Sequence, residues 1–586
     1  MLAPKTAQTD FSAGACPSFA RNLIPENGLY GLQNGLLNLD GGVYKRGGSK
    51  VLSTAGFGAA GLTWIWHGYF PAGHRTLFAN PSDFGVLDGS DAPINLGGSG
   101  LAEPATYAYL GGLLFIGGGT IYAGSLKANP YSTGTVDLTN GSAVVTGSGT
   151  SWSANVDAGM IFRHGSERVY VVKSVDSDGQ ITLTEPYQGA TDTGEAYTLK
   201  ALETASAPYR SSSLYAVAGQ KLISCENEKF YMSKLDDPHT WDADDNWALP
   251  GGVRIIGASG IENRLLLLTT AGLWQASNIE YDLTDEYGNP QHNVRQVTED
   301  INLWHPASMA TFAGDLIVPG TDGVWMVSER SYDKISRSID SRYSRHIADG
   351  CKPGQGHVYN SHFLLPIIDG SGEVREVLTC RLDRPTRARG QVIYPWGWLT
   401  GSGANVYGFA SRTVTSAVDK EKLIAAGAQA SSRVLDCSGY FTPKAAVKYD
   451  HDNTTPRMVL ETRDFPTGRM NKALVKAVEL SYRLIDAATD NPTISGSWSD
   501  GQAQESGSFW GIDMWGVGTW TSDVGSEFTD LLGVAPEDDG RKPKFWRLRF
   551  GRARTEYVRF RFRTNGPSHE CLIRSLEIFF RANRRL

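Results

Sequence analysis

Short apolar runs separated by tight-turn residues recur along most of the chain. The clearest copies are Arg254–Ser277 and Ser308–Ser328, each with three short runs, the last of which carries a Trp (Trp274 or Trp325). Runs of this length, rich in Leu, Ile, Val and Trp and bounded by Gly, Asn and Asp, indicate β-strands rather than helices. Copies about 50 residues apart fit the spacing of β-propeller blades. The pattern therefore predicts an all-β chain that contains a propeller.

The same triplet of runs recurs elsewhere at similar spacing. Aligned on the middle run, the copies begin near His74, Gly112, Gln220, Asn263, Gly314, Ser361 and Glu421. The intervals are 38, 108, 43, 51, 47 and 60 residues, so only the second departs from a blade length. We expect about seven blades, with a closing strand and the first blades within residues 1–133 and the remaining blades within residues 200–445.

The opening stretch, Asn22–Ser53, also alternates apolar and polar residues. Leu36–Leu39 and Val43–Lys45 predict a hairpin around an Asp-Gly-Gly turn. A stretch of this kind can supply an edge strand that closes a ring of blades, which removes an exposed edge.

The long interval contains a small unit of its own at residues 134–199. Six alternating runs lie there between Asn-Gly, His-Gly and Asp-Gly turns. Removing these 66 residues shortens the interval from 108 to 42. We interpret the unit as a small β domain inserted in a loop between two blades, where whole domains are tolerated.

Longer strands follow the last blade. Phe545–Phe550 and Val558–Phe562 largely alternate, with one apolar face and one Arg face, which is typical of a sheet with one buried and one wet side. We expect residues 446–586 to form a β-sandwich-like domain packed on the ring. A Gly- and Trp-rich loop inside it carries Trp510, Trp515 and Trp520, which either cover the core of the sandwich or contact a partner.

Composition narrows the class of protein. The 586 residues include 67 Gly, 10% aromatic and 20% charged residues, which fits a folded, turn-rich chain. The six cysteines are scattered without a CxxC pair, so free buried thiols in a reducing compartment are expected. Neither a secretory signal nor an apolar run of membrane length is evident, so we expect a soluble protein made in the cytoplasm.

The net charge of −7 is unevenly distributed. Residues 541–586 contain 14 Lys/Arg and three acids, a balance of +11, whereas the first 540 residues contain 41 against 59, a balance of −18. The basic end includes arginines at alternate positions of its strands. We interpret them as a protein-docking or solvent-exposed face rather than a nucleic-acid-binding surface. The candidate contact residues are Arg547, Arg549, Arg559 and Arg561.

Motifs for catalysis, phosphate binding and metal binding are missing from the sequence. It contains no GxGxxG after a strand, no phosphate loop, no HExxH and no GxSxG elbow in a strand–turn–helix context. The SWSDG at 497–501 matches part of a sialidase Asp-box only once, and a β-turn explains it. An acidic loop lacks EF-hand spacing, so a solvated loop is favoured over a Ca²⁺ site; its members are Asp236, Asp237, Asp242, Asp244 and Asp245. We therefore expect no catalytic residues, no metal and no cofactor, and a protein that is not an enzyme.

Three stretches together resemble one family. The opening NLIPEN…DGGVYKRGG, the span Phe230–Trp274 with SKLDDPHTWD, PGGVRIIG and LLLLTTAGLW, and the ending FWRLRFGRAR…VRFRFR…CLIRSLEI are similar to the tail nozzle or hub proteins of short-tailed bacteriophages, also called packaged-DNA-stabilisation proteins. The insertion instead resembles small β modules of phage tail proteins.

The resemblance implies a structural virion protein. It implies a homo-oligomeric ring, usually of six copies, below the portal and adaptor rings, assembled in the host cytoplasm and located in the virion tail. Expected partners are the adaptor or portal-associated ring, the tail needle, spike or fibre proteins, and packaged double-stranded DNA that passes through the lumen without sequence-specific binding. The alternative is a tail-associated propeller that binds or hydrolyses glycans during adsorption.

Overall fold

The chain folds almost entirely into β-strands in a computed structural model. The structure describes residues 5–581, except 39, 54–59, 242–245, 280–291, 389, 414–420, 429–432, 442–449, 453, 467–472, 486–492, 500–528, 532–543, 556 and 566–569. In this part of the chain the longest helix is α2 (Asp340–Ala348), and the other α-helix, α1 (Trp152–Asn155), is a single turn. The all-β class predicted from the alternation of residues is confirmed.

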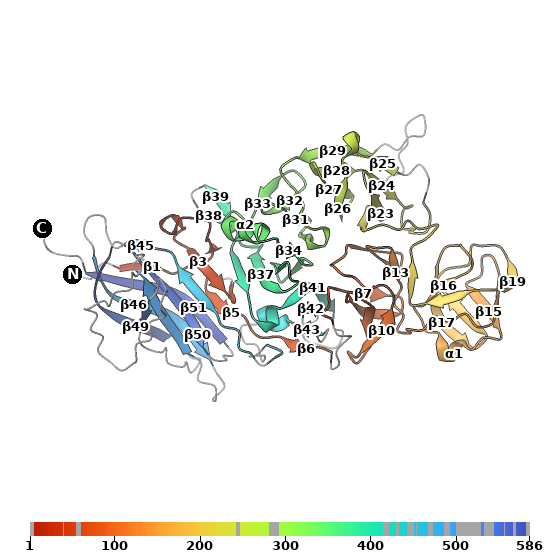
Figure 1. The fold of residues 1–586 in the computed structure, drawn as a ribbon, viewed down its shortest axis with the longest axis horizontal. Coiled ribbons are helices and arrows are strands. Elements are labelled where there is room, and N and C mark those ends of the chain that lie inside the picture. The colour runs from red at the N-terminus through yellow and green to blue at the C-terminus, as the bar shows by residue number, and fades with distance from the viewer. Residues whose placement is uncertain are drawn as a thin grey trace.

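A β-propeller forms the centre of the molecule, with its sheets arranged around a common axis (Figure 1). Among the described residues, six sheets have four strands each. Four of them are formed by consecutive strands: β7 to β10 (Trp64–Phe70, Gly73–Ala79, Phe84–Leu87, Pro93–Gly97), β22 to β25 (Leu214–Ala218, Lys221–Glu226, Lys229–Met232, Asn246–Ala248), β26 to β29 (Ile255–Ile261, Arg264–Thr269, Gly272–Ser277, Asn293–Thr298) and β30 to β33 (Ala310–Phe312, Asp315–Pro319, Val324–Val327, Tyr332–Lys334). The other two are completed by a strand from elsewhere in the sequence: β11, β12 and β13 (Tyr107–Leu110, Leu113–Ile116, Thr120–Tyr122) by β21 (Leu202–Thr204), and β41, β42 and β43 (Val406–Thr413, Glu421–Gly427, Val434–Asp436) by β6 (Lys50–Val51). A further part of the ring is formed by β35, β36, β37 and β40 (His357–Tyr359, His362–Ile368, Val374–Arg381, Trp396–Leu399), which belong to a larger sheet. The total of about seven blades stays a prediction.

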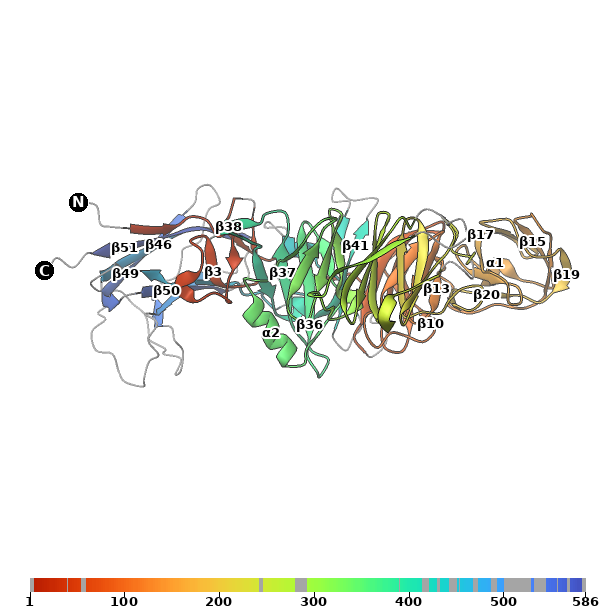
Figure 2. The ribbon, with the colours of Figure 1, turned by 90° about the horizontal axis from the view of Figure 1, so that it is seen from above.

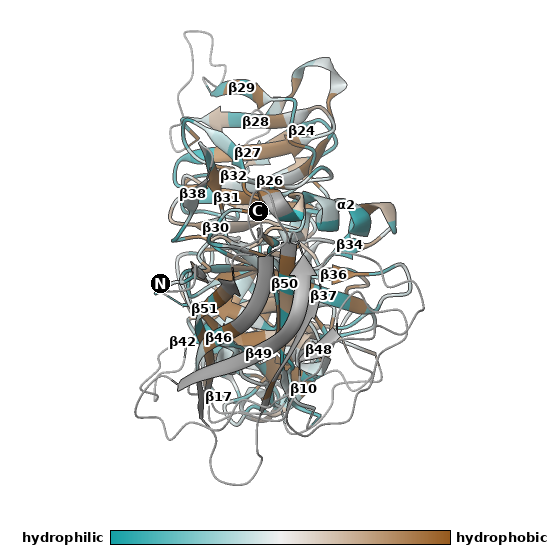
Figure 3. Ribbon diagram, turned by 90° about the vertical axis from the view of Figure 1, so that its left-hand side faces the viewer, coloured by the Kyte–Doolittle hydropathy of each residue, from teal (hydrophilic) through white to brown (hydrophobic). Residues whose placement is uncertain are grey.

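The middle strands of the blades bury both of their faces. Leu265 and Leu267 of β27 pack into the core shared with β22–β25, while Leu266 and Leu268 pack into the core shared with β31 and β32. Successive side chains of a strand point to opposite faces, so a strand between two neighbouring blades must be apolar at every position. Figure 3 shows the hydrophobic residues of these strands in brown, whereas α2 is largely teal.

Two-residue turns join the two innermost strands in most blades. In four of these turns both residues have positive φ: Gly111-Gly112, Gly219-Gln220, Ala313-Gly314 and Asn360-Ser361. This is the geometry of a type I′ turn, whose twist matches that of the flanking strands. The recurrent turns explain why the spacing of the blades can be read from the sequence.

Replacing Ala313 with glycine is expected to stabilise the chain by roughly 0.5–1 kcal/mol, because alanine is strained at the φ of 51° that this exposed turn requires. The free energy of unfolding from urea titration measures the gain. The matched control is Ala271→Gly in the turn between β27 and β28, because Ala271 does not have a positive φ. This substitution is expected to lower the free energy of unfolding by a similar amount. Equal effects at both alanines would contradict this explanation.

The opening segment divides between two parts of the fold, which differs from the expectation of one closing strand. Only β6 closes the ring, by pairing with β43. The predicted hairpin is present as β4 (Gly35–Leu37) and β5 (Val43–Lys45), but β5 pairs with β51 (Glu570–Arg581), and so does β1 (Lys5–Gln8). Leu37 and Val43 are buried in the core of the C-terminal sandwich, and this burial draws the hairpin away from the ring.

The C-terminal part is a sandwich of two sheets. One contains β4, β5, β51, β46 (Ala473–Ile485) and β49 (Lys544–Thr555), and the other contains β3 (Gly28–Gln33), β44 (Val459–Thr462), β50 (Tyr557–Asn565), β47 (Thr493–Ser499) and β48 (Thr529–Leu531). β3 also pairs with β40 of the propeller, so one sheet runs from the blade into the sandwich. The sandwich and the propeller therefore share a continuous hydrogen-bonded sheet.

Residues 135–200 form a seven-stranded sheet of their own, in the order β19, β14, β15, β18, β17, β16, β20. The strands are Asp192–Glu195, Thr135–Leu138, Val144–Ser148, Gln180–Leu183, Tyr170–Ser177, Ile161–Arg163 and Thr198–Lys200. This insertion has a core around Trp152, and it also shares a second core with two blades through Ile161, Val169 and Val171. It lies at the end of the molecule opposite the sandwich, and the three parts form one elongated row (Figures 1 and 2).

A buried ion pair ties the ring closure to the sandwich. The guanidinium of Arg46, between β5 and β6, donates to both carboxylate oxygens of Asp450 at 2.8 and 2.9 Å, and the two side chains are 0% and 1% exposed. Its remaining N–H groups donate to Asn34 Oδ1, Gly47 O and Thr400 O. Every donor of this arginine therefore has an acceptor.

Candidate functional site: the axial cavity and nearby surfaces

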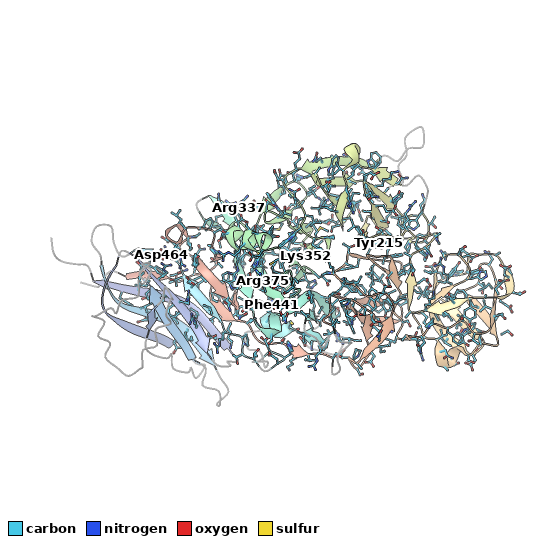
Figure 4. All side chains as sticks on the ribbon, in the orientation of Figure 1. Tyr215, Arg337, Lys352, Arg375, Phe441 and Asp464 are labelled. Carbon is cyan, nitrogen blue, oxygen red and sulfur yellow. The ribbon has the colours of Figure 1, made fainter. Side chains whose placement is uncertain are left out.

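A cavity of about 230 Å³ lies where the innermost strands converge. Five successive places in the ring contribute to its wall, through Thr106 and Tyr107, Tyr215, Ser259, Thr311, and Gln355. Figure 4 labels Tyr215, which lines this cavity. At roughly 30 Å³ for each water molecule, the cavity holds a small cluster of water or one small ligand.

The wall of the axial cavity is neutral. Its lining residues include hydroxyl, amide and small apolar side chains, and no carboxylate, histidine or cysteine is among them in the described chain. Gln355 is almost fully buried and holds the first blade by two bonds: its Nε2 donates to Ile65 O at 2.8 Å, and its Oε1 accepts from Ile65 N at 3.2 Å. A pair of carboxylates, which most glycosidases require, is not provided by this wall.

Charged residues meet on one rim of the ring. Lys352 Nζ donates to Glu103 Oε1 at 2.5 Å, and His305 Nε2 lies 3.8 Å from Glu103 Oε2. Glu103 and His305 lie in loops, and Lys352 lies on the short strand β34 (Lys352–Pro353). The hydrogen bond from Lys352 lowers the pKa of Glu103, and burial lowers the pKa of His305. Sequence reasoning missed this cluster because its members are far apart along the chain.

Of the contact residues predicted from sequence, two can be placed fully. Arg559 is 6% exposed, with its Nε 3.5 Å from Asp464 Oδ1 in the sandwich, and Arg561 Nη2 donates to Glu461 Oε2 at 3.2 Å (Figure 4 labels Asp464). Arg547 and Arg549 lie on β49, and nothing is described of their side chains. Trp510, Trp515 and Trp520 lie outside the described residues. A partner contact for any of the seven stays a prediction.

The acidic loop is only partly described, since Asp242, Asp244 and Asp245 lie outside the described residues. Asp237 Oδ1 accepts from the main-chain N–H of His239 at 2.8 Å, which is a turn-forming bond. Within the described ranges, no group of three His, Cys, Asp or Glu residues is placed to hold a metal ion.

Other reactive groups in the described residues have structural surroundings. Glu376 is buried, accepts a hydrogen bond from Arg342 Nε at 2.8 Å, and lies 2.7 Å from His346 Nε2. These contacts hold α2 against the propeller. All six cysteines are buried free thiols. No helix in the described part of the chain has the length and apolarity needed to cross a bilayer.

An aromatic surface on the β7–β8 hairpin was also missed from the sequence. Tyr69 is 61% exposed and its ring contacts the ring of His74, which in turn stacks on His67. A signal was present, because the run WIWHGYF at 64–70 places aromatic residues at both alternating phases of one strand. A strand that buries only one aromatic face must expose the other.

Comparisons with known proteins find likeness of structure only. No protein-family model matches the sequence, and no curated protein sequence is significantly similar to it. Among solved structures, Saccharomyces cerevisiae Sqt1 is similar over 66% of this chain and 99% of its own, with 11% identity and a TM-score of 0.34. The endosialidase of phage phi92 is similar over 67% of this chain and 63% of its own, with 10% identity and a TM-score of 0.22. The propeller assignment rests on the hydrogen-bonded sheets themselves.

Proposed function

We propose that the chain is a structural protein of a short-tailed phage, a subunit of the nozzle ring that extends the portal–adaptor channel, retains packaged DNA and guides its ejection. The observation that carries the proposal is the resemblance of three separated stretches, in order, to the nozzle and hub proteins. In the fold these stretches supply the opening hairpin, two central blades and the last strands of the sandwich.

The propeller of one chain is too narrow to be the DNA path. A sphere of about 230 Å³ is roughly 8 Å across, which is less than the width of roughly 12 Å of the major groove of B-DNA alone, so a duplex does not fit in this cavity. A channel for DNA must therefore be formed between several copies, and the propeller acts as part of its wall. The family resemblance implies six copies, and a closed ring of identical copies has a heterologous interface.

Charge supports the same role. The first 540 residues carry a balance of −18. A negative wall repels the phosphate backbone, so DNA slides past it without sequence-specific binding. In this arrangement one face of the ring binds the adaptor or portal-associated ring, and the other binds needle, spike or fibre proteins.

Cryo-electron microscopy of virions tests the proposal. We expect the elongated chain to fit a six-fold ring directly below the adaptor, with the sandwich and the insertion at opposite ends of each copy. Particles made without the protein are expected to package DNA and then lose it, measured as DNase-sensitive genome. Virions in which the chain is missing from the tail axis, or mutant particles that retain their DNA, would overturn the proposal.

A further inference from the structure

The β7–β8 hairpin presents a flat aromatic ring to solvent on a rigid base. Tyr69 and His74 are directly opposite each other in the strand register, so their side chains share one face of the hairpin. Their ring centroids are 5.2 Å apart, and the His74 ring is nearly parallel to that of His67 at 5.7 Å. The carbonyl of Tyr69 accepts from the hydroxyl of Tyr109 at 2.6 Å, which fixes the strand end. The ring is therefore held in place before any ligand binds.

Within the part of the chain that the structure describes, buried polar atoms without protein partners lie at His67 and at Arg412, whose charge acts on His67. His67 Nδ1 is 2.9 Å from Thr76 Oγ1, but its Nε2 is buried without a partner in the described chain. β41 packs against β7, and Arg412 of β41 pairs with Asp91 at 2.6 Å while its Nη1 has no hydrogen-bond partner among the described residues. Buried polar atoms of this kind normally find a partner, which can be an ordered water molecule behind the exposed rings.

The local charge is balanced. Asp91 neutralises Arg412, and burial, with help from Arg412 and His74, lowers the pKa of His67 to about 4. His67 is therefore neutral near pH 7 and able to donate or accept a hydrogen bond through its ring. A ligand that carries a net charge gains nothing from this surface.

The balanced charge of this surface disfavours nucleic acid as its ligand, and its small apolar area disfavours a protein partner. Single-stranded nucleic acid also stacks on aromatic rings, but it needs a cationic groove for its phosphates. Protein interfaces need a contiguous apolar core, whereas the other strongly exposed large apolar side chains in the described residues belong to separate strands and loops. The surface fits a small ligand with one apolar face and a rim of hydroxyl groups.

We infer that Tyr69 and His74, with His67 stacked on His74, form a binding site for a neutral hexopyranose unit of a polysaccharide. The C–H face of the sugar lies on the Tyr69 ring, and its hydroxyl groups bond the imidazole of His74. The site is independent of the nozzle role, because it lies on a single chain and needs no neighbouring copy.

Saturation-transfer NMR on the full chain tests the site. The probes are the methyl β-pyranosides of glucose, galactose, mannose and N-acetylglucosamine, each titrated separately. We expect transfer to the ring C–H protons of at least one probe, and binding about tenfold weaker in Tyr69→Ala. Tyr69→Phe keeps the ring and is expected to bind as the unsubstituted chain does.

Tyr332→Ala provides the matched control, because Tyr332 is a partly exposed tyrosine, 38% accessible, on the outer strand β33 of another blade. It is expected to leave binding unchanged, and circular dichroism checks that both alanine variants fold. Transfer to none of the four probes, or equal transfer in Tyr69→Ala, would overturn the inference. Neither result bears on ring assembly, which is measured on virions.

Discussion

Replacing Arg46 with alanine is expected to destabilise the folded chain by about 3–5 kcal/mol, the usual cost of removing one partner of a buried ion pair. Asp450 would keep its buried charge without a counter-ion. Thr400 O would also lose this donor, and Asn34 Oδ1 would keep only its bond from the main-chain N–H of Thr400. The shift in the midpoint of urea unfolding, followed by tryptophan fluorescence, measures the loss.

An exposed ion pair is the control for this experiment. Arg337 and Asp333 are 2.9 Å apart with side chains about 40% exposed, so Arg337→Ala is expected to cost at most about 1 kcal/mol. A double-mutant cycle of Arg46→Ala with Asp450→Asn should give a coupling energy within roughly 0.5–3 kcal/mol. If Arg46→Ala lowers the free energy of unfolding no more than Arg337→Ala does, the buried pair does not stabilise the fold as expected.

Deleting the insertion, residues 134–199, is expected to destabilise the propeller rather than remove a separate module. The deletion takes Ile161, Val169 and Val171 away from a core that they share with Phe115 and Leu222 of the blades. Full burial of each large side chain contributes about 1.5–3 kcal/mol, so partial exposure of several costs on the order of 4 kcal/mol. Thermal unfolding and binding of a hydrophobic dye measure the effect.

Val144→Ser is the control for the deletion, because Val144 lies on the exposed side of the insertion and is expected to change stability by no more than about 0.5 kcal/mol. A deletion variant with unchanged unfolding temperature and no added dye binding would contradict the shared core. The shared core also affects how adsorption assays are interpreted. A loss of adsorption in the deletion variant would not by itself show that the insertion recognises the host.

Local patterns predicted the blades well. The four consecutive leucines of β27 and the turn residues at Gly112 and Gly314 are visible in the sequence because each blade repeats the same local requirement. The insertion was visible because it lengthens one interval. The strands of the sandwich were visible because FWRLRF and VRFRF alternate over a strand length.

Features that depend on distant contacts could not be predicted. α2 is largely polar and is held by Arg342 and His346 on Glu376, about 30 residues away. The alternating pattern predicted that Arg559 lies on a solvent-exposed face. In the structure its side chain is buried and lies against Asp464. β6 has only two residues, too few to distinguish the closing strand from the hairpin before it.

The pairing of the first strand with the last sets the order of biogenesis. β1 and β5 bond to β51, so nearly the whole chain must be synthesised before either finds its partner. At about 5–20 residues per second, translation of 586 residues takes roughly 30–120 s, during which β1 and β5 lack β51 and β5 has only its hairpin partner β4. The insertion, whose strands pair within 66 residues of sequence, has no such delay and can fold while the ribosome is still translating the blades.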